Sequence, residues 1–113
     1  FFDLPKQNNN VVTPWLAFPL VLNKSSPFKR KKLQIFLEKN NIQTRTIFTG
    51  NILRQPIMKK KFYKKVKNAE INSNNIMKNG ILIGCHHGLG NNDINYIIKN
   101  LKIFIKRIDR LNI

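Results

Sequence analysis

Residues 81–111, ILIGCHHGLGNNDINYIIKNLKIFIKRIDRL, contain the clearest structural pattern in the chain. Their second half places apolar residues three or four positions apart, the spacing of one helix face, at Ile94, Ile97, Ile98, Leu101, Phe104, Ile105, Ile108 and Leu111. Asn91 or Asn92 can cap this helix, and 81–85 before it is a short, wholly apolar segment typical of a strand. The stretch therefore predicts a strand, a turn at 86–90 and a long helix that packs on an apolar surface.

Two further strands are predicted upstream. Residues 15–22 (WLAFPLVL) form an apolar run of strand length, in which Pro19 favours an edge position or a bulge. Residues 42–49 (IQTRTIFT) are rich in β-branched side chains, which favour strands.

Two shorter helices are predicted between these strands and the C-terminal stretch. The first begins with Ser26 as its N-cap and Pro27 as its first residue, and it stops at 40–41, where two asparagines follow each other. The second covers 72–79, and Gly80 would end it in a left-handed conformation.

The order of these segments defines the expected fold. It is β-α-β-(α)-β-α, which predicts an α+β fold class with a three-stranded sheet and helices packed on one face. Residues 1–14 are expected to be a polar lead-in or linker, and residues 15–113 a single small domain.

Composition excludes several classes of protein. The 113 residues hold 21 Lys and Arg against 5 Asp and Glu, a net charge of +16, which would attract nucleic acid or anionic lipid. The same chain has 16 Lys, 17 Asn and 16 Ile, a bias that A/T-rich codons alone can produce. One cysteine excludes an internal disulfide and indicates a reducing, cytoplasmic compartment. No apolar run is long enough to span a membrane, and the missing initiator Met predicts a segment of a longer product.

Residues 51–56 (NILRQP) form the first candidate site, a loop that follows a predicted strand. Arg54 supplies a guanidinium suited to phosphate or carboxylate, and Asn51 and Gln55 supply amides that recognise hydroxyls or carbonyls. Polar groups on an irregular segment suit a binding loop, and an ordinary solvent-facing loop is the alternative interpretation.

Two other segments attract functional interpretations. In Cys85-His86-His87, neighbouring side chains point to alternate sides and cannot converge on one metal ion, so no metal site is expected. His86 either presents an imidazole to a ligand at the end of its strand or bonds to the backbone of the turn. Residues 59–67 (KKKFYKKVK) mix cations with aromatic rings as a nucleic-acid contact does, or form a lysine-rich surface loop. A small basic nucleic-acid-binding domain is therefore the alternative function, although nucleic acid is not the favoured partner.

Several motifs in order resemble a known family. They are TPWLAFPLVL at 13–22, LEKNNIQTRTIFTGNILRQP at 37–56 and NSNNIMKNGILIGCHHGL at 72–89, followed by the amphipathic helix. Together they resemble the C-terminal small domain of the DegT/DnrJ/EryC1/StrS family of pyridoxal-phosphate-dependent sugar aminotransferases and dehydratases. The sequences of these motifs are most similar to those of the branch of CDP-4-keto-6-deoxyglucose-3-dehydratases in lipopolysaccharide O-antigen biosynthesis.

The resemblance implies a role as part of a larger enzyme. Family members are cytoplasmic homodimers of fold type I, and their large N-terminal domain binds pyridoxal phosphate and carries the active-site Lys or His. That domain is absent from this chain, so the chain would be a fragment with no catalytic residue of its own, contributing dimer packing and a sugar-nucleotide pocket loop. Candidate substrate-binding residues are Asn51, Arg54 and Gln55, with Asn75 where the branch often has a basic residue and His86 where it has a more aromatic segment. The resemblance does not decide between dehydration and transamination. It also leaves open which nucleotide the sugar carries and whether the full enzyme holds an iron–sulfur cluster.

Overall fold

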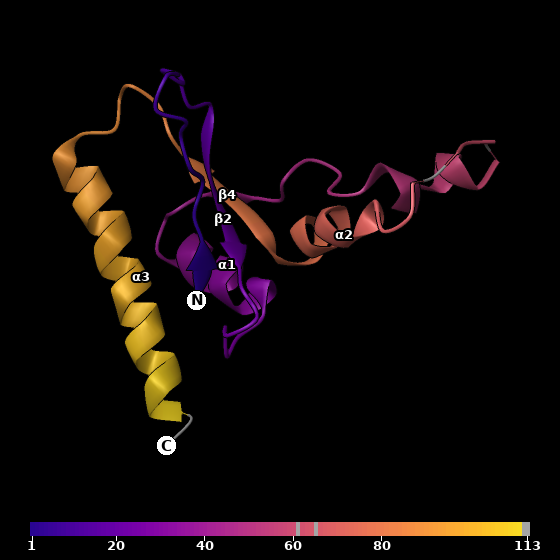
Figure 1. The fold of residues 1–113 in the computed structure, drawn as a ribbon. Coiled ribbons are helices and arrows are strands. Elements are labelled where there is room, and N and C mark those ends of the chain that lie inside the picture. Colours follow the sequence, from indigo (N-terminus) through magenta and orange to yellow (C-terminus); the bar gives the residue numbers. More distant parts are fainter. Residues whose placement is uncertain (61, 65, 112–113) are drawn as a thin grey trace.

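The fold is a four-stranded antiparallel sheet with two helices on one face and a third helix at its end (Figure 1). The computed structural model describes residues 1–60, 62–64 and 66–111. The strands follow the order β1-β2-β4-β3 in the sheet, and their bounds are β1 Phe2–Asp3, β2 Ala17–Leu22, β3 Thr44–Arg45 and β4 Gly80–Gly84. The helices are α1 Arg30–Lys39, α2 Glu70–Asn79 and α3 Asn91–Leu111, with short 3-10 helices η1 Ile52–Arg54 and η2 Pro56–Lys60 between β3 and α2.

The prediction of three strands was wrong, because part of the expected lead-in forms a fourth. Phe2 pairs with Leu22 along the outer edge of β2. The rings of Phe1 and Phe2 also contact Phe28, with centroids 6.0 and 6.1 Å away. A two-residue strand is too short to show alternation in the sequence, so its aromatic anchors were not recognised as sheet residues.

Pro19 lies in a part of β2 that has a partner on one side only. It is opposite Leu82 of β4, whereas β1 reaches only Val21 and Leu22. The missing N–H of proline therefore leaves no gap in the ladder, as the edge interpretation of this residue required.

The strand expected over 42–49 is much shorter in the structure. Only Thr44 and Arg45 pair with β4. Phe48 and Gly50 then adopt positive φ angles of 44° and 71°, and the N–H of Gly50 donates to the carbonyl of Ile47 at 2.9 Å. A turn therefore ends the strand, despite the β-branched residues that continue beyond it.

Three predicted helix caps were wrong and one predicted stop is confirmed. Helix α3 already includes Asn91 and Asn92, so neither residue precedes it as a cap. Helix α1 begins at Arg30, and the hydroxyl of Ser26 donates to the carbonyl of Phe28 instead of capping the helix. Gly80 has a φ of −81° and opens β4 directly, without a left-handed turn. Asn41, with a φ of 57°, ends α1 where the asparagine pair predicted a stop.

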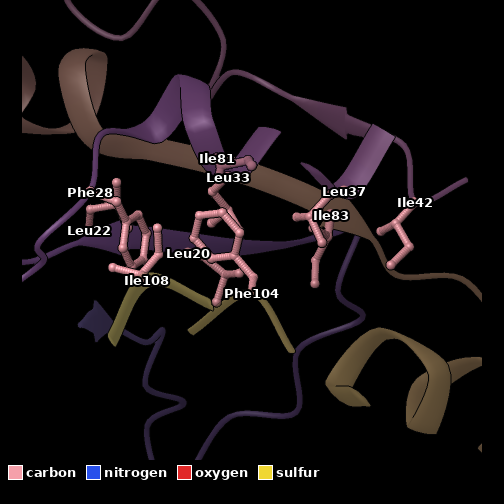
Figure 2. Close-up of a cluster of buried hydrophobic side chains, with 10 residues drawn as sticks. All are labelled: Leu20, Leu22, Phe28, Leu33, Leu37, Ile42, Ile81, Ile83, Phe104 and Ile108. Carbon is pink, nitrogen blue, oxygen red and sulfur yellow. The ribbon is translucent and has the colours of Figure 1, made fainter. Parts of the chain in front are cut away.

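The core lies between the sheet and helices α1 and α3. Alternate residues of β2 and β4 point toward side chains from both helices (Figure 2). The buried set consists of Leu20, Leu22, Phe28, Leu33, Leu37, Ile42, Ile81, Ile83, Phe104 and Ile108. Phe104 of α3 joins the layers, because its ring packs edge-on against Phe28 at 4.8 Å and lies 5.2 Å from Phe36.

The opposite face of the sheet is open. Here Pro19 and Leu82 line a groove of about 1020 Å³ together with Trp15 and Phe48. Phe48 is 81% exposed. In the described part of the chain, no helix has both the length and the apolar character needed to cross a membrane.

Candidate substrate-binding loop

Gly50 determines how the candidate loop sits on α2. Its φ of 71° is unfavourable for any residue with a Cβ. A Cβ placed there would also lie 2.4 Å from the Cβ of Met77, inside van der Waals contact. Glycine is therefore required at this position for two reasons, the turn and the close approach of the loop to α2.

Asn51 is the buried anchor of the loop. It is only 2% exposed, and its Oδ1 accepts from the N–H of Leu53 at 2.9 Å, capping η1. Its Nδ2 donates to Oδ1 of Asn74 on α2, also at 2.9 Å. Because both ends of this buried amide are bonded, its orientation is fixed and it ties the loop to the helix.

Arg54 leaves η1 beside the same helix. Its Nε donates to Oδ1 of Asn74 at 3.2 Å, and its Nη2 lies 4.0 Å from Oε2 of Glu70. The side chain is 58% exposed, so much of a group with five N–H donors faces solvent. The guanidinium can thus receive a phosphate or carboxylate in a bidentate arrangement.

Gln55 has a structural contact within the loop. Its Nε2 donates to the carbonyl of Thr49 at 3.3 Å. The bond joins the end of η1 to the residue before Gly50, and so it closes the loop on itself. Asn51, Arg54 and Gln55 therefore lie together, as their spacing in the sequence suggested.

Asn75 and His86 do not join this cluster. Asn75 is exposed, and its Oδ1 accepts from Asn79 on its own helix at 2.7 Å. His86 is exposed beyond the far end of β4, whereas α2 precedes the start of that strand. Nδ1 of His86 accepts from the N–H of Gly88 at 3.1 Å, which makes it part of the turn.

The structure adds a residue that the sequence did not single out. Asn74 holds both Asn51 and Arg54 through one oxygen atom. It is one of 17 asparagines in the chain, and nothing in the spacing along α2 distinguishes it from Asn72 or Asn75. Only the approach of the loop at Gly50 explains its contacts.

The lysines and the potential metal ligands outside the loop are the other groups that could form a charged cluster. Every lysine whose surroundings the structure describes is exposed, and no group of three or more described His, Cys, Asp or Glu residues could hold a metal ion. Residues 59–67 are exposed where described, and positions 61 and 65 lie outside the described residues. The nucleic-acid interpretation of this segment stays a prediction.

The fold and the loop define a small α+β domain that presents the anchored Arg54 to solvent. The comparisons with known proteins then give the family. The model of the DegT/DnrJ/EryC1/StrS aminotransferase family matches residues 2–102. The chain belongs to this family.

Curated relatives share about three residues in ten. The chain is 31% identical over 104 residues to the lipopolysaccharide biosynthesis protein RfbH of Salmonella typhimurium, covering 92% of this chain and 24% of RfbH. It is 32% identical over 107 residues to a GDP-4-keto-6-deoxy-D-mannose 3-dehydratase of Yersinia pseudotuberculosis, covering 95% of this chain and 26% of that enzyme. The chain thus spans about a quarter of the length of these relatives.

Solved structures show the same arrangement. The Escherichia coli GDP-4-keto-6-deoxy-D-mannose-3-dehydratase with bound hydrated PLP superposes with a TM-score of 0.77 at 30% identity, over 89% of this chain and 25% of that one. A variant of GDP-4-keto-6-deoxymannose-3-dehydratase with bound GDP-perosamine gives a TM-score of 0.76 at 30% identity, over 89% of this chain and 26% of that one.

The described residues do not fit pyridoxal phosphate (PLP). This cofactor is held inside a shaped pocket that excludes competing reactions, and the described lysines are all exposed. His86 and His87 are also exposed, on a turn. No chemical step can therefore be assigned to this part of the chain through the cofactor.

Proposed function

We propose that this chain is the C-terminal small domain of a PLP-dependent sugar-nucleotide 3-dehydratase that acts in O-antigen deoxysugar biosynthesis. The observation that carries the proposal is the superposition of 89% of the chain on a 3-dehydratase with bound hydrated PLP. The name of RfbH supports the link to lipopolysaccharide. The names of the relatives favour dehydration over transamination.

The contribution of this domain to the enzyme is substrate binding through the loop at 51–56. Arg54 binds an anionic oxygen of the nucleotide diphosphate through its exposed guanidinium, because a planar fork of N–H donors matches phosphate geometry. Asn51 keeps the loop in place from its buried position. The net charge of +16 also favours the approach of an anionic sugar nucleotide.

The cofactor belongs to residues of the full enzyme outside those described. When bound, PLP acts as an electron sink for carbanion chemistry. The full enzyme is proposed to be a cytoplasmic homodimer, which size-exclusion chromatography with light scattering would test. A monomer at micromolar concentration would contradict the homodimer.

The activity is tested on the full-length protein that contains this chain. The protein is loaded with PLP and incubated with 4-keto-6-deoxy sugars linked to CDP, GDP or dTDP, with and without glutamate. Mass spectrometry of the products distinguishes loss of the 3-hydroxyl from gain of an amine. Loss of the 3-hydroxyl from one of the three substrates supports the proposal. Transamination alone, or no turnover of any of them, would overturn it.

A further inference from the structure

The amide oxygen of Asn74 is the point where the buried and exposed halves of the loop meet. We propose that Asn74 is a positioning residue, which aims the guanidinium of Arg54 at the diphosphate of the sugar nucleotide. The inference rests on the proposed function, since it assigns a role to a residue behind a substrate contact. It adds a determinant of affinity that does not itself touch the ligand.

The geometry uses the full acceptor capacity of one atom. A carbonyl oxygen has two lone pairs. Oδ1 of Asn74 accepts from Nδ2 of Asn51 at 2.9 Å and from Nε of Arg54 at 3.2 Å. The first donor is 2% exposed and is fixed by its own cap on η1. The second belongs to a side chain that is 58% exposed.

Asn74, which is bonded to the buried amide of Asn51, thereby restricts the conformations of the exposed Arg54 side chain. A long exposed side chain populates many rotamers, and binding must then select one of them at an entropic cost. A hydrogen bond at Nε restricts those rotamers before the ligand arrives. It uses none of the N–H groups on the terminal nitrogens, so Nη1 can bind a phosphate together with an N–H of Nη2, the atom that also lies 4.0 Å from Oε2 of Glu70.

Helix α2 is anchored independently of Asn74. Nη1 of Arg30 donates to the carbonyls of Met77 and Gly80, at 2.8 and 3.1 Å. Gly50 packs directly against Met77 on the same turn. Because these contacts hold the C-terminal turn of α2, replacing the side chain of Asn74 should change the arginine more than it changes the helix.

Asn74→Ala in the full-length protein tests this role by calorimetry with GDP, CDP and dTDP as separate probes. We expect the dissociation constant of the nucleotide that binds to rise about tenfold, the upper end of the entropic cost of immobilising one flexible side chain on binding. Asn74→Asp keeps an acceptor oxygen for both donors and should stay within about threefold of the original affinity. Asn72→Ala, on an exposed position of the same helix, is the matched control.

A double-mutant cycle separates positioning from a general effect on the fold. In the Arg54→Ala background, Asn74→Ala should cause no further loss of affinity, because the group that it positions is gone. An equal loss in both backgrounds would show that Asn74 acts through the fold, and would overturn the inference. Asn74→Gln moves the amide oxygen outward by one methylene and should also weaken nucleotide binding severalfold. Unchanged affinity in this variant would overturn the inference, and this test does not depend on whether Asn74→Ala folds.

The failure of this inference differs from failure of the proposed function. If Arg54→Ala leaves the affinity for all three nucleotides unchanged, the loop does not bind the diphosphate and the proposed role of the loop is lost. If Arg54→Ala weakens binding and Asn74→Ala does not, the loop keeps its role and only the positioning by Asn74 is wrong.

Discussion

The two sides of this small domain are held together by different kinds of contact. Between the sheet and helices α1 and α3, ten buried apolar side chains among the described residues form a continuous core. Between the loop at 51–56 and α2, the contacts are one glycine against a helix turn and a few hydrogen bonds that converge on Asn74. The first side tolerates exchange of one apolar residue for another of similar volume. The second depends on single atoms, so we expect it to be the side where substitutions change binding more than stability.

The largest expected loss of stability comes from the apolar side. Leu33→Ala removes a side chain that is fully buried in α1, and it should lower the free energy of unfolding by about 3 kcal/mol. Urea denaturation followed by circular dichroism measures this change. Ile35→Ala, at an exposed position of the same helix, should cost less than about 0.5 kcal/mol. Equal costs for the two variants would contradict the assignment of the core.

Gly50→Ala tests the backbone contact on the polar side. The positive φ and the overlap with Met77 should together destabilise the protein by about 2 kcal/mol and move the loop away from α2. Gly84→Ala is the control, because a Cβ at Gly84 would meet nothing within 4 Å. A stable Gly50→Ala variant with unchanged nucleotide affinity would show that this contact does not position the loop.

Asn51→Ala tests the buried amide. It removes the cap of η1 and the bond to Asn74, and it should cost about 1 kcal/mol of stability. Nucleotide affinity in the full-length protein should also fall, by more than the small unfolded fraction that this loss of stability creates would explain. An affinity equal to that of the unaltered protein would show that this hydrogen-bond network does not contribute to nucleotide binding.

The smallest expected effect is a dependence of stability on pH at Glu38. The hydroxyl of Thr44 and then its backbone N–H donate to this carboxylate, and these bonds lower the pKa of Glu38 from its ordinary value of 4.5. The resulting stability is present in full above that ordinary pKa and is lost as the pH falls through the lowered value. Denaturation of Glu38→Gln between pH 7 and pH 3 should therefore show a flatter acid limb. A limb as steep as that of the unaltered protein would contradict the assignment.

The apolar side of the fold could be predicted from the sequence because its signal is periodic. Phe104 and Ile108 recur at helical spacing, and they are buried where that spacing places them. Strand β1 was missed because two residues are too few to show an alternation of apolar and polar side chains. The turn at Phe48 and Gly50 was missed because a positive φ at a phenylalanine has no sequence signature.

The polar side could be predicted only in part. Asn51, Arg54 and Gln55 could be predicted to lie together because they are neighbours in one loop. Asn74 could not be recognised, since its role arises from a tertiary contact between segments more than twenty residues apart. His86 illustrates the converse: it follows a strand, as a ligand-facing residue often does, but that strand ends away from the loop.

The chain has a single tryptophan, and its position gives the open face of the sheet an optical reporter. Trp15 lines the groove opposite the core, with its ring 6.4 Å from that of Phe18. Its fluorescence therefore responds to the water in that groove. Any surface that covers the groove should shift the emission toward shorter wavelength. Coverage of this open face can thus be followed without an added label.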